Sequence, residues 1–219
     1  MKLFFSLIIL LLFTQKALGK DLESKYLVKT KGIVIGKLVW NLKITENLYK
    51  SSITLSDKGL LSAIYKFDGL YEVSGSIKNT MLIPNRYTQR WITKKKERFV
   101  EIFFKNRNIS NLQIKPTETE IARINYQNLK DYSDPITSFI NIFFNNIGSN
   151  TIDGRRIYYL LPTKEDGYTK VFVNNYTNIW ADHKRNDLEY LEVFGIHNKG
   201  LPDRINIKFK GSVFSLIKN

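Results

Sequence analysis

The segment Leu38-Val39-Trp40-Asn41-Leu42-Lys43-Ile44 places a large apolar side chain at every second position. Side chains two residues apart share one face of an extended chain, so the apolar positions lie together and Asn41 and Lys43 lie on the opposite face. This alternation is typical of a β-strand that buries one face. Ile205, Ile207 and Phe209 repeat the pattern near the end of the chain.

The same period of two dominates the chain after residue 25. Further candidate strands cover residues 26–35, 47–56, 70–79, 86–93, 97–105, 109–114, 155–161, 168–173, 177–183, 189–197 and 211–217. Turn-forming residues separate many of them, for example Pro84-Asn85, Asp153-Gly154 and Glu165-Asp166-Gly167. Many short strands at this spacing predict a mainly β fold, namely a curved antiparallel sheet or an open half-barrel.

One segment has a helical period instead. Asp134 and Pro135 have the residue types of a helix N-cap and first turn. Large apolar residues then follow at helical spacing: Ile136, Phe139, Ile140, Phe143, Phe144 and Ile147. We therefore predict an amphipathic helix over about 135–146, packed on the concave face of the sheet. Residues 59–67 fit a second, short helix, and residues 115–130 fit a surface loop.

The first nineteen residues have the three parts of a secretory signal peptide. Lys2 gives a positive start, Leu3 to Phe13 form an apolar run, and Ala17-Leu18-Gly19 provides the small residues of a cleavage site. The run is shorter than the roughly 20 residues of a membrane-spanning helix, although a retained membrane anchor is the alternative. We expect an exported, periplasmic protein with residues 20–219 forming a single domain. The chain has no cysteine, which excludes both disulfides and lipid attachment to a thiol.

The chain has a formal net charge of +14, which becomes +12 when Lys2 and Lys16 leave with the signal peptide. Positive charge favours encounters with anionic partners, such as lipid head groups or acidic polysaccharide. Export argues against nucleic acid as the partner. The alternative is that the abundance of Lys, Asn and Ile reflects an AT-rich genome, with no bearing on a ligand.

Several landmarks occur in order along most of the mature chain. They are Gly36, the segment from Gly59 to Phe67, Pro84, the segment Asp134-Pro135-Ile136-Thr137-Ser138-Phe139, and the segment Leu201-Pro202-Asp203-Arg204-Ile205. In these landmarks the chain resembles the bacterial exported domain-of-unknown-function family 3108, although Asp203 stands where that family usually has an apolar residue. The resemblance implies an exported β-rich fold similar to the open half-barrels of periplasmic lipoprotein carriers. It implies no reaction and no catalytic residues.

The residues offer little for catalysis. Without cysteine there is no thiol nucleophile, and His183 and His197 are too few for a typical zinc site. Asp182 and His183 are neighbours on a candidate strand, so their side chains would point to opposite faces. Glu165 and Asp166 fit a solvated turn better than a pair of catalytic carboxylates. We therefore expect no enzyme, no cofactor and no metal, with a hydrolase as the least favoured function.

The aromatic residues suggest a binding function instead. If the sheet stays open around the helix, an apolar cleft would form; if it closes tightly, the same side chains are core. The candidate ligand-binding residues are Trp40, Trp91, Phe139, Phe143, Phe144, Arg86 and Arg90. The two arginines belong to a basic segment for which a solvated, charged hairpin is the favoured alternative, because a turn must be polar whatever the protein binds.

We therefore predict a non-enzymatic binding or carrier module for a lipid-like or other hydrophobic ligand, with basic rim residues meeting an anionic envelope component. The alternative is an envelope-assembly protein that binds another protein or a cell-wall polymer through a strand edge. The sequence does not specify the oligomeric state.

Overall fold

The structure is a computed structural model that describes residues 19–57, 67–181, 184–196 and 200–219. The predicted signal peptide up to residue 18, nearly all of the candidate helix over 59–67, and both histidines lie outside these ranges. Phe67, the last residue of that candidate helix, begins a strand.

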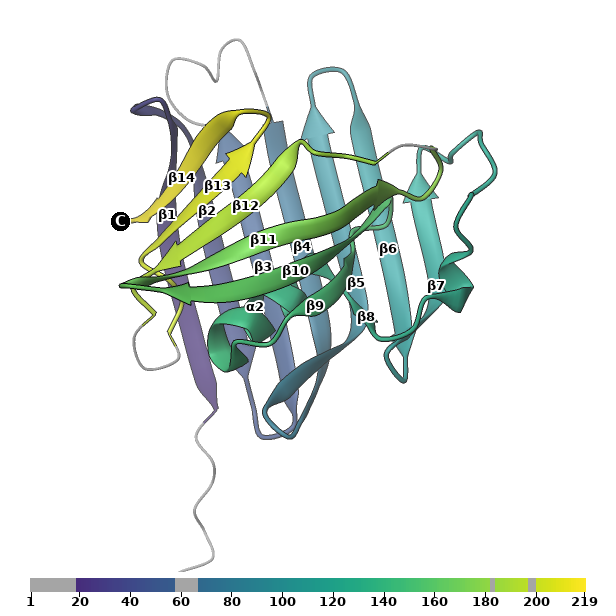
Figure 1. The fold of residues 1–219 in the computed structure, drawn as a ribbon, viewed down its shortest axis with the longest axis horizontal. Helices are drawn as coiled ribbons and strands as arrows, with labels where there is room; N and C mark the ends of the chain where they lie inside the picture. Colours follow the sequence, from purple (N-terminus) through teal and green to yellow (C-terminus); the bar gives the residue numbers. More distant parts are fainter. Residues whose placement is uncertain (1–18, 58–66, 182–183, 197–199) are drawn as a thin grey trace, which may run out of the picture.

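Fourteen strands of the described chain form one sheet (Figure 1). They are β1 (Lys20–Thr30), β2 (Ile33–Ile44), β3 (Leu48–Asp57), β4 (Phe67–Lys78), β5 (Met81–Thr93), β6 (Glu97–Lys105), β7 (Asn108–Lys115), β8 (Tyr132–Ser133), β9 (Ser149–Ile152), β10 (Arg156–Glu165), β11 (Tyr168–Asn178), β12 (Leu188–Phe194), β13 (Arg204–Phe209) and β14 (Ser212–Lys218). Their order in the sheet is β7-β6-β5-β4-β3-β2-β1-β14-β13-β12-β11-β10-β9-β8. All neighbours are antiparallel except β8 and β9, which are parallel. A short 3₁₀ helix, η2 (Tyr126–Asn128), lies between β7 and β8.

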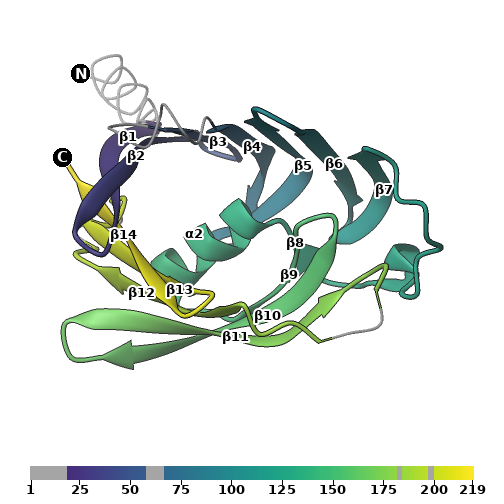
Figure 2. The ribbon, with the colours of Figure 1, turned by 90° about the horizontal axis from the view of Figure 1, so that it is seen from above.

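The sheet curls so that β2–β5 face β10–β14, with helix α2 (Pro135–Asn145) between them (Figure 2). This confirms the predicted mainly β fold with one amphipathic helix on the concave face. The sheet is nearly closed and barrel-like, because the turn before β10 packs against β6. Gly154 lies directly against Val100 there. The same turn is held to the end of the β11 segment, because the backbone N–H of Ile179 donates to the carbonyl of Arg155 at 2.9 Å.

The predicted boundaries of three strands, over residues 26–35, 168–173 and 177–183, were wrong. Residues 26–35 are not one strand, because Lys31 and Gly32 form a turn with positive φ between β1 and β2. Residues 168–173 and 177 belong to the single strand β11, which ends at Asn178, so no separate strand starts at 177.

Pro84 lies inside β5 and not in a turn before it. The pairing register of β4 and β5 shifts between Ser74 and Gly75, and Pro84 faces Gly75 beside that bulge. A bulge tolerates the missing N–H of proline.

Helix α2 begins and ends as its sequence predicts. The Asp134 Oδ1 accepts hydrogen bonds from the backbone N–H groups of Ile136 and Thr137 at 2.9 and 3.0 Å, and Pro135 occupies the first turn. Asn146 ends the helix in the left-handed conformation, with φ of 54°. The chain turns away at that point, so Ile147 is 46% exposed and does not extend the buried stripe.

The helix is buried on more than its apolar stripe. Ile140 belongs to the larger core cluster, most of whose members come from β1–β7, whereas Ile142 packs into a second cluster with Tyr158, Val171 and Val193. The helix also contacts β9, where the Ser138 hydroxyl lies 2.9 Å from the Ser149 hydroxyl. The helix therefore joins both halves of the sheet.

Asp134 makes stability depend on pH. It is fully buried, its Oδ2 has no hydrogen-bond partner among the described residues, and burial raises its pKa from 3.8 to about 6. Between these two values the folded protein holds a proton on Asp134 that the unfolded chain releases, so this residue's contribution to stability falls as pH rises through that window.

Asp134→Asn keeps the helix cap and removes the ionisation. We expect the variant to gain about 2–3 kcal/mol in free energy of unfolding, relative to wild type, as pH rises from 4 to 7. Urea unfolding of both proteins across this pH range measures the difference. A constant difference would show that Asp134 ionises in the folded protein as it does in the unfolded chain.

Candidate functional site

An apolar cavity of about 410 Å³ lies inside the barrel above α2 and is partly open to solvent. One wall comes from β2–β5, the other from β10, β12, β13 and β14, and the floor from the first turns of the helix. The apolar lining residues on the walls are Leu38, Ile53, Leu55, Leu160, Leu188, Leu191, Ile205, Ile207 and Leu216. They line it because each strand directs alternate side chains to the concave face.

Trp40 and Phe139 form the aromatic part of this floor. Both line the cavity, and their rings stack with centroids 6.0 Å apart. The Trp40 Nε1–H donates to the Ser51 hydroxyl at 2.9 Å, and that hydroxyl donates to the Asn41 carbonyl at 2.9 Å. The indole is therefore fixed in place, with its polar group satisfied away from the cavity.

Phe143 and Phe144 do not line the cavity. Phe143 is 8% exposed and packs against Trp40 and Phe144, with ring centroids 5.8 and 4.8 Å apart. Both phenylalanines lie deeper along the helix, behind the floor. In these positions they stabilise the helix against the sheet and do not contact the cavity.

Trp91 lies on the inner face of β5, farther from the helix than the cavity-lining Tyr87 and Gln89. Its ring stacks on Phe67, with centroids 5.5 Å apart and planes 4° from parallel. Gly69 leaves room for this ring, since a Cβ at that position would lie 2.9 Å from Trp91. Trp91 is therefore a rim residue beyond the cavity.

Arg86 and Arg90 lie on the opposite face of β5 from Tyr87 and Gln89 and point away from the cavity. The Arg86 guanidinium pairs with Glu101 at 2.7 Å and Arg90 pairs with Glu97 at 2.7 Å. Both ion pairs join neighbouring strands on the outer face of the sheet. The Arg86, Arg90 and Glu97 side chains are exposed, whereas that of Glu101 is largely covered. The structure thus separates the two predicted arginines from the predicted aromatic residues.

The polar groups of the cavity come from residues that were not singled out in the sequence. Gln89, Asp153 and Arg156 line one corner of it. The same three residues, with Arg98, Val100 and Arg155, line an adjoining hollow of about 60 Å³. We call these polar residues, Gln89, Arg98, Asp153, Arg155 and Arg156, the arginine corner.

A signal for the arginine corner was present in the strand pattern. Arg98 lies two and four residues before the inward-facing Val100 and Ile102 of β6, so the alternation places an arginine on the apolar face. The same alternation places Arg156 on the inward face of β10, two and four residues before the cavity-lining Tyr158 and Leu160, whereas Arg155 gave no such signal. The positions of both arginines depend on the Asp153–Gly154 turn and on its contact with β6.

Hydrogen bonds hold Asp153 within the arginine corner. Its Oδ1 accepts from the backbone N–H groups of Arg155 and Arg156 at 2.9 and 2.8 Å, and its Oδ2 lies 3.5 Å from the Arg156 guanidinium. Burial raises the pKa of Asp153, while the charge of Arg156 and these N–H groups act in the opposite direction. The carboxylate serves to orient the turn, because most of its acceptor capacity is already used.

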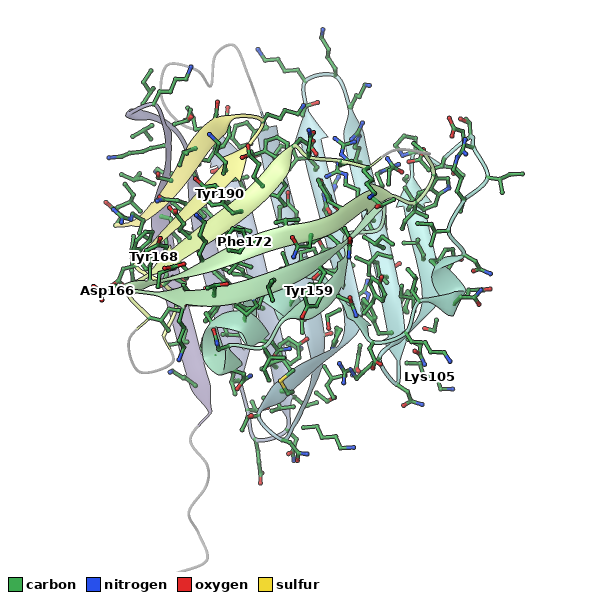
Figure 3. All side chains as sticks on the ribbon, in the orientation of Figure 1. Lys105, Tyr159, Asp166, Tyr168, Phe172 and Tyr190 are labelled. Atoms are coloured by element: carbon green, nitrogen blue, oxygen red, sulfur yellow. The ribbon has the colours of Figure 1, made fainter. Side chains whose placement is uncertain are left out.

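Many aromatic side chains lie on the outer face and not around the cavity. Tyr168, Phe172 and Tyr190 lie over β11 and β12 on the outside of the barrel (Figure 3). Lys170 Nζ lies 5.3 and 4.5 Å from the ring centroids of Phe172 and Tyr190. The aromatic residues of the sequence are therefore divided between this outer surface and the interior, where Tyr71, Tyr87 and Tyr158 line the cavity together with Trp40 and Phe139.

No cluster of three or more metal-ligating side chains occurs among the described residues. Within the same residues, no helix has both the length and the apolar character needed to cross a membrane.

Comparison with known proteins supports the fold. No family model and no curated protein matches the sequence. The structure is similar to the crystal structure of a β-barrel-like protein of domain of unknown function DUF1849 from Brucella abortus, with a TM-score of 0.54 over 91% of this chain and 95% of that chain. The two sequences are 8% identical, so the likeness concerns the β-barrel-like fold alone.

Proposed function

We propose that this protein is a non-enzymatic carrier or binding module that holds a lipid-like or other hydrophobic ligand in the cavity above α2. The observation that carries the proposal is the cavity itself. Protein interiors are normally close-packed, with few voids larger than a water molecule. Here about 410 Å³ stays open between well-packed walls, within the range of roughly 300–1,000 Å³ that small-molecule sites occupy.

The chemistry of the lining favours a hydrophobic ligand. Aliphatic residues make up most of the walls, and the polar groups gather at one corner. A ligand with a long apolar part would remove these side chains from water, at a gain of roughly 25 cal/mol per Å² of buried apolar surface. Rigid apolar walls with few polar groups suit binding better than bond cleavage.

The sequence supports a periplasmic location for this function. A signal peptide over residues 1–19 would export the chain, and the resemblance to domain family 3108 implies an exported bacterial protein. A carrier in that compartment would move an apolar molecule through the aqueous space between two membranes.

Quenching of Trp40 fluorescence tests the proposal, because Trp40 lines the cavity. In a Trp91→Phe, Trp180→Phe background, a brominated fatty acid should quench the remaining tryptophan in a saturable manner. Quenching that never saturates would mean that the acyl chain meets the protein without entering the cavity.

Two double variants test whether the acyl chain binds in the cavity: one fills the cavity, and the other makes similar changes on the outer face. Leu55→Phe with Ile207→Phe places two larger side chains in the cavity, and we expect the affinity for the acyl chain to fall on the order of tenfold or more. Leu70→Phe with Val213→Phe makes the same kind of change at two outer positions that are 39% exposed, and should leave the affinity unchanged. Circular dichroism checks that both double variants fold.

A further inference from the structure

The arginine corner carries more positive than negative charge. Three guanidinium groups line it: Arg98 from β6, Arg156 from the start of β10, and Arg155 from the turn just before that strand. Arg156 pairs with Asp153, and Arg155 pairs with Glu118. Arg98 has no ion-pair partner in the part of the chain that the structure describes, so the corner holds one surplus positive charge.

The geometry keeps the arginines close to one another. Burial, followed by the charges of Arg98 and Arg156, lowers the pKa of Arg155. Repulsion between like charges is unfavourable unless an anion lies among them. Asp153 does not supply that anion to Arg98, because its oxygens are already bound to the turn and to Arg156.

The arginine corner is continuous with the apolar cavity. Gln89, Asp153 and Arg156 border both the cavity and the adjoining hollow. A molecule whose apolar part lies against Trp40 and Phe139 can therefore extend a polar end towards Arg98 without leaving the protein.

We propose that the ligand is a single-chain amphiphile with an anionic head group, a carboxylate or a phosphate, which Arg98 binds while the acyl chain fills the cavity. The inference rests on the proposed function and adds the class of ligand. Guanidinium groups bind carboxylates and phosphates through paired, charge-assisted hydrogen bonds, whereas a neutral hydroxyl offers neither the charge nor the second oxygen.

Calorimetric titration with decanoic acid, decyl phosphate and decan-1-ol tests the head group separately from the chain. We expect either anionic ligand to bind at least about tenfold more tightly than the alcohol. Equal affinity for acid and alcohol would overturn the inference and leave the proposed carrier function intact. Failure of all three to bind would instead overturn the proposed function.

Arg98→Gln is the decisive variant. It should lower the affinity for decanoic acid about tenfold and leave the affinity for the alcohol unchanged. Arg90→Gln removes the same charge from the outer face of the same hairpin, where Arg90 pairs with Glu97, and should change neither affinity. An equal effect of the two substitutions would show that only the overall charge matters, which would overturn the inference.

Inorganic phosphate and acetate show whether the site binds a free anion. Tight binding of either one without an acyl chain would overturn the assignment of an amphiphile.

A second control concerns folding of the variant. Arg98 is exposed at the rim, so we expect Arg98→Gln to fold. If it does not, Arg98→Lys keeps the charge but loses the paired geometry, and should recover only part of the preference for the acid.

Discussion

Replacing Asn141 with alanine is expected to lower the free energy of unfolding by about 3–4 kcal/mol. Asn141 is 3% exposed and bonds to both backbone groups of Leu82. Its Oδ1 accepts from the Leu82 N–H at 2.9 Å, and its Nδ2 donates to the Leu82 carbonyl at 2.8 Å. Alanine would leave two buried backbone groups unpaired, each at a cost of roughly 1–3 kcal/mol.

The large effect follows from the position of Leu82 in the sheet. β6 pairs with β5 only from Arg86 to Ile92, so the earlier part of β5 has β4 on one side and no strand on the other. The side-chain amide of Asn141 takes the place of the missing strand, because an amide carries the same donor and acceptor as a peptide group. This bond also fixes the helix, and thus the cavity floor, to the wall.

Urea unfolding followed by circular dichroism measures the effect. Asn145→Ala is the matched control, since Asn145 lies one turn later and donates to the Thr80 carbonyl at 3.2 Å in an exposed position. We expect it to cost less than about 1 kcal/mol. Similar losses for the two variants would mean that the Asn141 amide adds nothing beyond an ordinary surface hydrogen bond.

Replacing Gly154 with valine is expected to lower the free energy of unfolding by about 3 kcal/mol and to disturb the arginine corner. Gly154 has φ of +94°, which β-branched residues adopt only with strain, and a Cβ there would overlap the Val100 side chain. The turn would have to move away from β6. Because Asp153 and Arg155 flank Gly154, their positions would change with it.

Gly167→Val separates the two contributions. Gly167 also has positive φ, at 78°, but a Cβ at this turn would meet nothing within 4 Å. Gly167→Val should therefore lose roughly 1–3 kcal/mol in free energy of unfolding from backbone strain alone, because no side chain overlaps the new one. If both variants lost the same stability, close packing between the turn and β6 would not hold the barrel together.

Val100→Ala provides a second check on this contact. Combined with Gly154→Ala, it should cost less than the two single substitutions would together, because the smaller side chain makes room for the added methyl group. If the losses in free energy of unfolding of the two single variants simply added in the double variant, the cost of Gly154→Ala would come from backbone strain and not from overlap with Val100.

The sequence on its own determined the class of the fold and the position of the helix. The alternation from Leu38 to Ile44 defines which side chains turn inward, since a strand has a period of two whatever it packs against. Asp134, Pro135 and the apolar spacing after them define the helix, because capping and periodicity are local properties. The same patterns place Trp40 and Phe139 on the inward faces of their elements, and both line the cavity.

Only the tertiary structure decided which residues meet in the interior. Arg86 was chosen for its charge, but its parity on β5 directs it outward to Glu101, whereas Arg98 on the next strand points inward. The arginine corner joins β6 to a turn more than fifty residues away in the sequence, and the contact depends on how far the sheet curls before Gly154 reaches Val100. Strand periodicity fixes the face of each side chain, but the curvature that brings two strands together arises from packing across the whole sheet.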